Sequence, residues 1–168
     1  MRTLLIVACL TACGGPKAEP VNPNEPETAV AWKDMNLDQR AGYMKDVVLP
    51  ATRKIFAKFD PKFATMDCVT CHGDGVENGD FAMPDAKIKP LPSTPEAFMA
   101  WVSKDPEAGR YAKFMSEEVE PLMGKLLDKT VFDPATGKGE LSCAACHTLV
   151  DAAGKRIEAP KNAEDHAH

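Results

Sequence analysis

The sequence predicts an all-α domain built from two copies of one helix–loop–helix unit. Three observations favour it: two segments with helical periodicity begin at capping signals, their residues recur in the same order, and no segment alternates as a β-strand does. The chain has 168 residues, 44% of them hydrophobic, which suits one compact domain or two small lobes. We therefore expect little or no sheet.

The N-terminal segment has the layout of a secretory signal. Residues 1–12 run from one Arg through an apolar stretch to small residues, and the stretch is too short to span a membrane. Residues 10–13, LTAC, resemble the lipobox of bacterial lipoproteins, which implies cleavage before Cys13 and a lipid on its sulfur and new amino group. The alternative is an ordinary soluble signal with a chance Cys beside it.

A tether is expected next, because residues 14–30 are rich in Pro, Glu and Asn and show no period. We assign residues 13–33 to the lipidated Cys and this tether. Without its signal the chain carries 19 Lys and Arg against 25 Asp and Glu, a net charge of −6. This acidity argues against a nucleic-acid partner and predicts partners with basic docking surfaces.

The first predicted helix starts at Asn36, where Gln39 is placed as in a capping box. The second starts at Asp105, with Pro106 at the first helical position. A short apolar helix, 97–102, precedes it after a start signal at 93–96. In the first helix one face should carry Leu37, Ala41, Met44 and Val48. We also expect Met99 and Met123 to pack in the core. A final helix should begin at Ser142 and end at Gly154.

The two long helices belong to a repeat. Residues 43–50, YMKDVVLP, match residues 114–121, FMSEEVEP, so an aromatic residue, Met, an acid, Val and Pro recur in register. Phe-Asp-Pro then recurs at 59–61 and 132–134. Each Pro lacks an amide hydrogen and sits six residues past the Met, so both helices should bend at this same place in the repeat. We expect repeats at about 36–80 and 106–152 in a domain spanning 34–155, followed by a charged tail, 156–168.

Each repeat closes with a CxxCH motif. Cys9 is lost with the signal and Cys13 takes the lipid, which leaves four cysteines in residues 68–72, CVTCH, and 143–147, CAACH. CxxCH is the attachment pattern of c-type haem. Its two thiols lie on one helical turn and reach the two vinyl groups of one porphyrin, and the adjacent His is the proximal iron ligand. The predicted attachment residues are Cys68, Cys71, Cys143 and Cys146, with His72 and His147 as iron ligands.

Two other chemistries use such cysteine pairs. A Cys₄ zinc site needs no His after each pair, and 71 residues separate Cys71 from Cys143. A thioredoxin-like redox pair belongs in a βαβ setting, which the sequence does not suggest. The sequence therefore favours two covalent haems as cofactors.

The second axial ligand of each iron decides between electron transfer and chemistry on a substrate. Apart from the two motifs, the only histidines are His166 and His168 in the tail, so methionines are the candidates. A helical Met is usually core filler, but Met44 and Met115 occupy matching places in the repeat. Met83, before Pro84 in the loop after the first motif, is a weaker alternative that resembles the axial Met of small single-haem cytochromes.

Helices that carry a Met ahead of each CxxCH resemble the repeats of the photosynthetic reaction-centre cytochrome c subunit. Residues 79–85, GDFAMPD, leading to 110–115, RYAKFM, and then Met123 resemble that family's stretch between haem motifs. The resemblance covers most of 36–148 loosely, and the chain has two haem motifs where the family usually has four. It implies Met115 as axial ligand of the second haem and, by the repeat, Met44 of the first.

The expected function is transfer of single electrons between redox partners, without catalysis on a substrate. The expected place is the periplasmic side of a bacterial membrane, anchored by lipid, with Gly14 after Cys13 a weak hint toward the outer membrane. The protein could work inside a larger electron-transfer complex. The alternatives are a small peroxidase-like haem enzyme and a haem redox or gas sensor, both of which need one open axial position.

Overall fold

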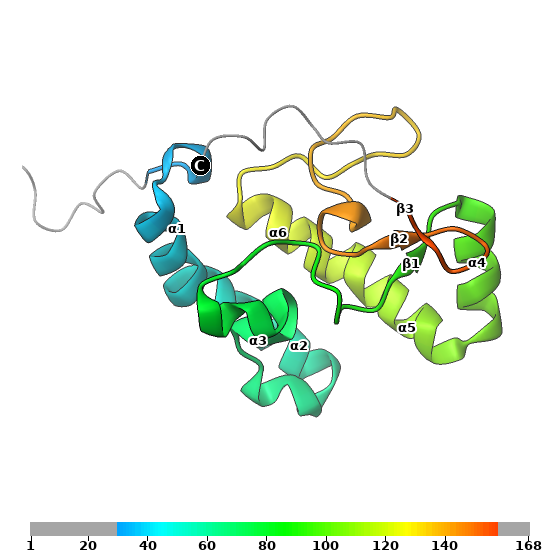
Figure 1. Ribbon diagram of the computed structural model, residues 1–168, viewed down its shortest axis with the longest axis horizontal. Helices are drawn as coiled ribbons and strands as arrows, with labels where there is room; N and C mark the ends of the chain where they lie inside the picture. The colour runs from blue at the N-terminus through cyan, green and yellow to red at the C-terminus, as the bar shows by residue number, and fades with distance from the viewer. Residues whose placement is uncertain (1–29, 158–168) are drawn as a thin grey trace, which may run out of the picture. The chain divides into compact units, whose positions relative to one another are not determined.

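The computed structural model describes residues 30–157, and from Ala31 onward they belong to one compact unit. Helices dominate, with a small three-stranded sheet, so the expected mainly helical architecture is confirmed (Figure 1). The predicted signal, Cys13, most of the tether and residues 158–168 lie outside the described part. Within that part, no helix is both long and apolar enough to cross a membrane.

The first long helical segment has three parts after a short 3₁₀ turn, Trp32–Asp34. They are α1 (Leu37–Tyr43), a π-helical turn (Met44–Val48) and α2 (Leu49–Phe59). The predicted capping box is present: the Asn36 side chain accepts from the Gln39 amide at 2.9 Å, and the Gln39 side chain accepts from the Asn36 amide at 2.8 Å.

The second long segment repeats this plan. It follows α4 (Pro95–Lys104) and consists of α5 (Pro106–Phe114), a π-helical turn (Met115–Val119) and α6 (Glu120–Leu126). Thr94 caps α4 and Asp105 caps α5, each by accepting backbone amides. Both predicted helix starts are therefore confirmed.

Both predicted irregularities take the form of a π turn. In each segment the carbonyl of the Met accepts from the amide five residues later, at Leu49 and at Glu120, and the next residue is Pro. A Pro cannot donate to the carbonyl four residues earlier, and its ring would collide with that carbonyl in an α-helix. One extra residue in the turn relieves both conflicts.

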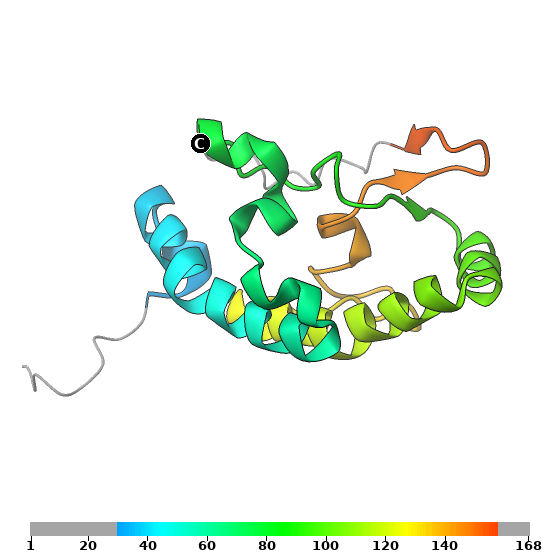
Figure 2. The same cartoon turned by 90° about the horizontal axis from the view of Figure 1, so that it is seen from below.

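The two long segments pack side by side in opposite directions (Figure 2). At one end the Tyr43 hydroxyl donates to the carbonyl of Leu126 at 2.8 Å. At the other end the rings of Phe56 and Phe114 lie 5.0 Å apart, and those of Phe59 and Tyr111 lie 4.9 Å apart. The two prolines therefore lie between these two ends, Pro50 near the middle of its segment and Pro121 in the last third of its own.

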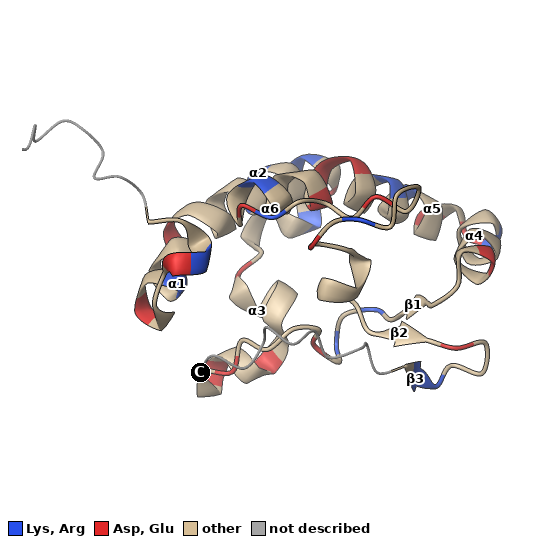
Figure 3. Cartoon of the chain, turned by 90° about the horizontal axis from the view of Figure 1, so that it is seen from above, with Lys and Arg blue, Asp and Glu red and all other residues tan. Residues whose placement is uncertain are grey.

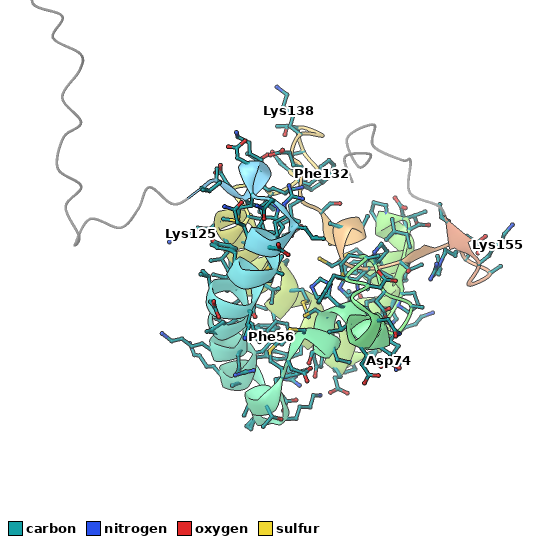
Figure 4. The ribbon with its side chains drawn as sticks, turned by 60° about the vertical axis from the view of Figure 1, so that its left-hand side comes forward. Phe56, Asp74, Lys125, Phe132, Lys138 and Lys155 are labelled. Atoms are coloured by element: carbon teal, nitrogen blue, oxygen red, sulfur yellow. The ribbon has the colours of Figure 1, made fainter. Side chains whose placement is uncertain are left out.

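One apolar cluster sits between the segments. Its buried members are Phe56, Met66 and Phe114, and Figure 4 labels Phe56 between α2 and the neighbouring helices. Partly buried neighbours pack around it: Ile55, Phe59, Phe63, Cys71, Met115 and Val119. No large side chain of residues 30–157 is less than 2% exposed, so the polypeptide by itself forms only a thin core.

Several burial and boundary expectations are wrong. Met99 is 60% exposed and not in the core, and Leu37 is 80% exposed although Val48 on the same predicted face is buried. No final helix forms between Ser142 and Gly154. The hydroxyl of Ser142 makes no capping bond, and Gly154, at φ 77°, lies in the turn of a hairpin.

The motifs lie on short elements. The first follows a 3₁₀ turn (Pro61–Thr65) and forms α3 (Cys68–His72), continued by a 3₁₀ segment (Gly73–Asn78). The second forms a 3₁₀ turn (Cys143–Ala145). The sheet joins β1 (Leu91–Pro92) parallel to β2 (Leu149–Val150), which pairs antiparallel with β3 (Arg156–Ile157).

Candidate functional site

The first CxxCH motif is a single helical turn with defined ends. Asp67 precedes it, and the Asp67 amide donates to the Thr70 hydroxyl at 3.2 Å. Gly73 ends it at φ 68°, where any other residue would be strained and a Cβ would overlap the Asp85 carboxyl group. Because the motif is helical, Cys68 and Cys71 lie on the same side of one turn, as attachment to one porphyrin requires.

The second motif is wound more tightly but keeps the same elements. The amide of His147 donates to the carbonyl of Cys143 at 2.8 Å, which closes the turn around the motif. Two residues before the first Cys of each motif stands a buried apolar side chain, Met66 or Leu141. The duplication therefore extends into the packing that holds each motif.

Both motif histidines are oriented in the same way. The Nδ1 atom of His72 lies 2.9 Å from the carbonyl oxygen of Phe81, and Nδ1 of His147 lies 2.9 Å from that of Lys89. A carbonyl oxygen only accepts, so Nδ1 carries the hydrogen in each ring and the neutral ring presents a lone pair at Nε2. An outer hydrogen bond of this kind is what fixes a metal-binding imidazole.

The four cysteines are free thiols. Burial, together with the nearby thiols of Cys146 and Cys68, raises the pKa of the Cys71 thiol to about 11. Burial also raises the pKa of Cys143 and of Cys146, with Glu120 adding to both effects. Cys71 of the first motif and Cys146 of the second are thus close enough for their charges to interact.

These thiols are poor candidates for the two competing chemistries. Reactive disulfide-exchange cysteines have a lowered pKa, whereas every shift resolved for this set is upward. A Cys₄ zinc site would bring several thiolates around one point. Residues 30–157 contain no group of three or more His, Cys, Asp and Glu side chains placed to hold a metal ion.

The candidate axial methionines differ in their surroundings. Met44 and Met115 are half-buried, and each begins a π turn, an irregularity that is common at functional sites. Met115 packs against the Phe56 cluster, as does Cys71 of the first motif. Met83 is half-buried in the loop after the first motif. Met66 is 4% exposed, and its carbonyl accepts from the Arg53 guanidinium, which suits a purely structural role.

Some site groups were missed by the sequence analysis. The carbonyls of Phe81 and Lys89 belong to the backbone, so no side-chain pattern marks them. Glu120 was not singled out, because it aligns with Leu49 in the repeat and the recurring acid is Glu117. It is half-buried beside Cys143 and Cys146, and burial raises its pKa. Its place one residue before Pro121 is the only sequence signal that could have singled it out.

No family model, curated protein or solved structure matches this chain. The chemistry of the site therefore rests on its own residues. Two pairs of unpaired thiols, each followed by a His whose Nε2 is free to bind a metal, fit covalent attachment of one haem per motif. The thin core between the helices fits a fold that is completed by large apolar groups.

Proposed function

We propose that the chain is a lipid-anchored c-type cytochrome with two haems that carries single electrons between redox partners. The observation that carries the proposal is the shared orientation of the two motif histidines, each with Nδ1 hydrogen-bonded to a backbone carbonyl at 2.9 Å. That arrangement has no role in a disulfide-exchange protein. It is what a His needs in order to bind iron through Nε2.

The residues divide the work as follows. Cys68 with Cys71, and Cys143 with Cys146, would each hold one haem by thioether bonds, and the adjacent His would bind its iron. A bound c-type haem supplies a one-electron iron couple whose potential is raised by a Met as second axial ligand. Met44 and Met115 are the proposed second ligands, supported by their matching π turns. The chain's part is to orient the ligands and limit access of water.

A carrier is favoured over a peroxidase-like enzyme or a sensor. An enzyme of that kind needs polar groups at an open axial position to cleave an O–O bond. Both histidines of the described part, His72 and His147, belong to CxxCH motifs, and neither is free for acid–base work. A sensor would need one ligand that leaves easily, and the two matching π turns favour equivalent coordination of the two irons.

The partners we propose are redox proteins with basic docking surfaces. Residues 67–86 contain five acidic side chains and no Lys or Arg, and the ribbon around α3 carries red segments in Figure 3. Val69, within the first motif, is 36% exposed, and Phe81, against His72, is 45% exposed. An apolar centre with an acidic rim suits a partner whose own rim is rich in Lys. The acidic residues are Asp67, Asp74, Glu77, Asp80 and Asp85.

The proposed location follows from the signal and Cys13, so the protein would face the periplasm from a lipid anchor. Stable anchoring requires more than one acyl chain, which is what lipobox processing attaches. Mass spectrometry of the membrane fraction tests this part, and a Cys13→Ser variant should appear in the soluble periplasm. Recovery of that variant in the membrane would contradict the anchor.

The deciding experiment is an optical spectrum of the natively matured, reduced protein with haem quantified per chain, before and after carbon monoxide. Two haems per chain and no response to carbon monoxide are expected, because both irons would be six-coordinate. Fewer than two haems would refute the proposed cofactors. A shift at one haem would move the conclusion to the enzyme or the sensor.

A further inference from the structure

The two hydrogen bonds that orient the histidines come from one short stretch of chain. Phe81, which accepts from His72, and Lys89, which accepts from His147, are separated by only seven residues. The two motifs that carry these histidines lie 75 positions apart in the sequence. We name residues 81–89 the histidine bridge.

The bridge is fastened to the first motif. The amide of Asp80 donates to the carbonyl of Gly75 at 2.9 Å, and Lys87 forms an ion pair with Asp74 just after the motif. The Asp85 carboxyl group lies so close to Gly73 that a Cβ there would overlap it. The Phe81 ring also packs edge-on against His72, with centroids 5.6 Å apart.

The other end of the bridge is fastened to the second motif. Two residues after Lys89, the chain enters β1, whose Leu91 amide donates to the carbonyl of Thr148 at 2.9 Å. Thr148 is the residue that follows His147 and is itself buried. The amide of Ser93 then donates to Val150 at 2.9 Å. Residue 89 therefore cannot move far from His147 unless this parallel pairing is broken.

Asp85 connects the two ends. Its side chain accepts from the Lys87 amide at 2.7 Å and its carbonyl accepts from the Ile88 amide at 3.3 Å, which closes a turn between Gly73 and Lys89. Asp85 lies only four positions before Lys89, whose carbonyl holds His147. A displacement of Asp85 at the first motif has to be absorbed within those positions or passed on.

We infer that the histidine bridge is a shared positioning element, through which a disturbance at the first motif changes the hydrogen bond and the iron affinity of His147 at the second. The inference rests on the proposed function, since it concerns histidines as iron ligands. A hydrogen bond at Nδ1 makes an imidazole a more basic ligand, which favours oxidised iron. Loosening the bridge should therefore raise the potential of the second haem as well as that of the first.

The test is an Asp85→Ala variant of the full, matured protein, with both potentials measured by redox titration. An upward shift of both potentials, with two haems retained, is expected. In the reduced protein with ¹⁵N-labelled His, exchange of the Nδ1 hydrogens with solvent should become faster for His72 and for His147. Asp85→Asn keeps the accepting oxygen and should behave as wild type.

Asp151→Ala is the matched control. Asp151 closes a similar turn by accepting from the amides of Ala153 and Lys155, and it lies four positions from His147, as Asp85 lies four from Lys89. It should leave both potentials in place. If Asp85→Ala does not mature, Lys87→Pro removes the same hydrogen bond from the donor side. It also removes the ion pair with Asp74, for which Lys87→Met is the control.

The outcomes separate the two proposals. Two haems per chain with a shift confined to the first potential, or with no shift, would overturn the shared bridge and leave the cytochrome proposal standing. A wild-type protein that binds fewer than two haems would refute the cytochrome proposal itself. Equal shifts in Asp85→Ala and in Asp151→Ala would also overturn the bridge, because a local turn would then have no special connection to His147.

Discussion

Removal of the buried Phe114 ring should destabilise the fold much more than removal of the exposed Phe132 ring. Phe114 is 7% exposed, and its ring lies 5.0 Å from Phe56, edge-on, and 4.0 Å from Phe59, stacked. Truncation of a buried Phe to Ala costs about 3–5 kcal/mol. Each aromatic pair contributes roughly 0.5–1.5 kcal/mol of that cost. Because Phe114 holds α2 against α5, both helices should lose stability together.

The assay is urea unfolding of the matured protein, followed by far-ultraviolet circular dichroism. With a denaturant dependence of about 2 kcal/mol/M, a loss of ~4 kcal/mol lowers the midpoint by roughly 2 M. Phe132→Ala is the control, because Phe132 is 39% exposed and lies outside the cluster (Figure 4). Its cost should stay below about 1 kcal/mol. A similar midpoint for the two variants would refute the assignment of Phe114 to the core.

Three further predictions concern the site and the helix pair. Met44→Ala and Met115→Ala should each lower one haem potential and give a high-spin signal at one haem; unchanged spectra would exclude that Met as a ligand. Burial raises the pKa of Glu120 in the folded state. The free energy of unfolding should therefore fall as the pH rises from the ordinary Glu range through that raised pKa. Glu120→Gln should remove this fall from a pH series of unfolding curves. Tyr43→Phe removes the hydrogen bond to the Leu126 carbonyl and should lower the free energy of unfolding by about 1 kcal/mol. The Tyr111 hydroxyl bonds only the exposed Lys62 side chain, so Tyr111→Phe should cost less in thermal unfolding.

The elements with strong local signals could be predicted from the sequence. Asn36, Thr94 and Asp105 each start a helix as expected, because a capping side chain satisfies amides that no other group can reach. The site of irregularity also followed from Pro50 and Pro121, since the missing amide hydrogen is a covalent fact. Even the Asx turns at Asp60 and Asp133 repeat, and in both residues a bond from the amide two positions later lowers the carboxyl pKa.

The errors lie where tertiary contacts decide the outcome. Residues after His147 have apolar side chains that suit a short helix or a short strand, and pairing of Leu149 with Leu91 selects the strand. Periodicity places Leu37 on the face of Val48, but the helix extends beyond its partner, so Leu37 is exposed. The carbonyls that orient His72 and His147 could not be predicted, because every residue type carries the same backbone oxygen.

The pairing of each Met with a motif is where the duplication and the packing give different answers. By sequence order Met115 belongs to the second motif, which follows it in the same repeat. In the fold the two helical segments run in opposite directions, so Met115 lies beside the second half of the first segment (Figure 2). There it packs against the cluster of Phe56, Met66 and Phe114, which Cys71 of the first motif also contacts. Duplicated units that pair head to tail can exchange ligands in this way without any change in sequence. Assignment of the high-spin signal in Met115→Ala to the first or the second haem therefore tests whether the repeats act separately or complete each other's sites.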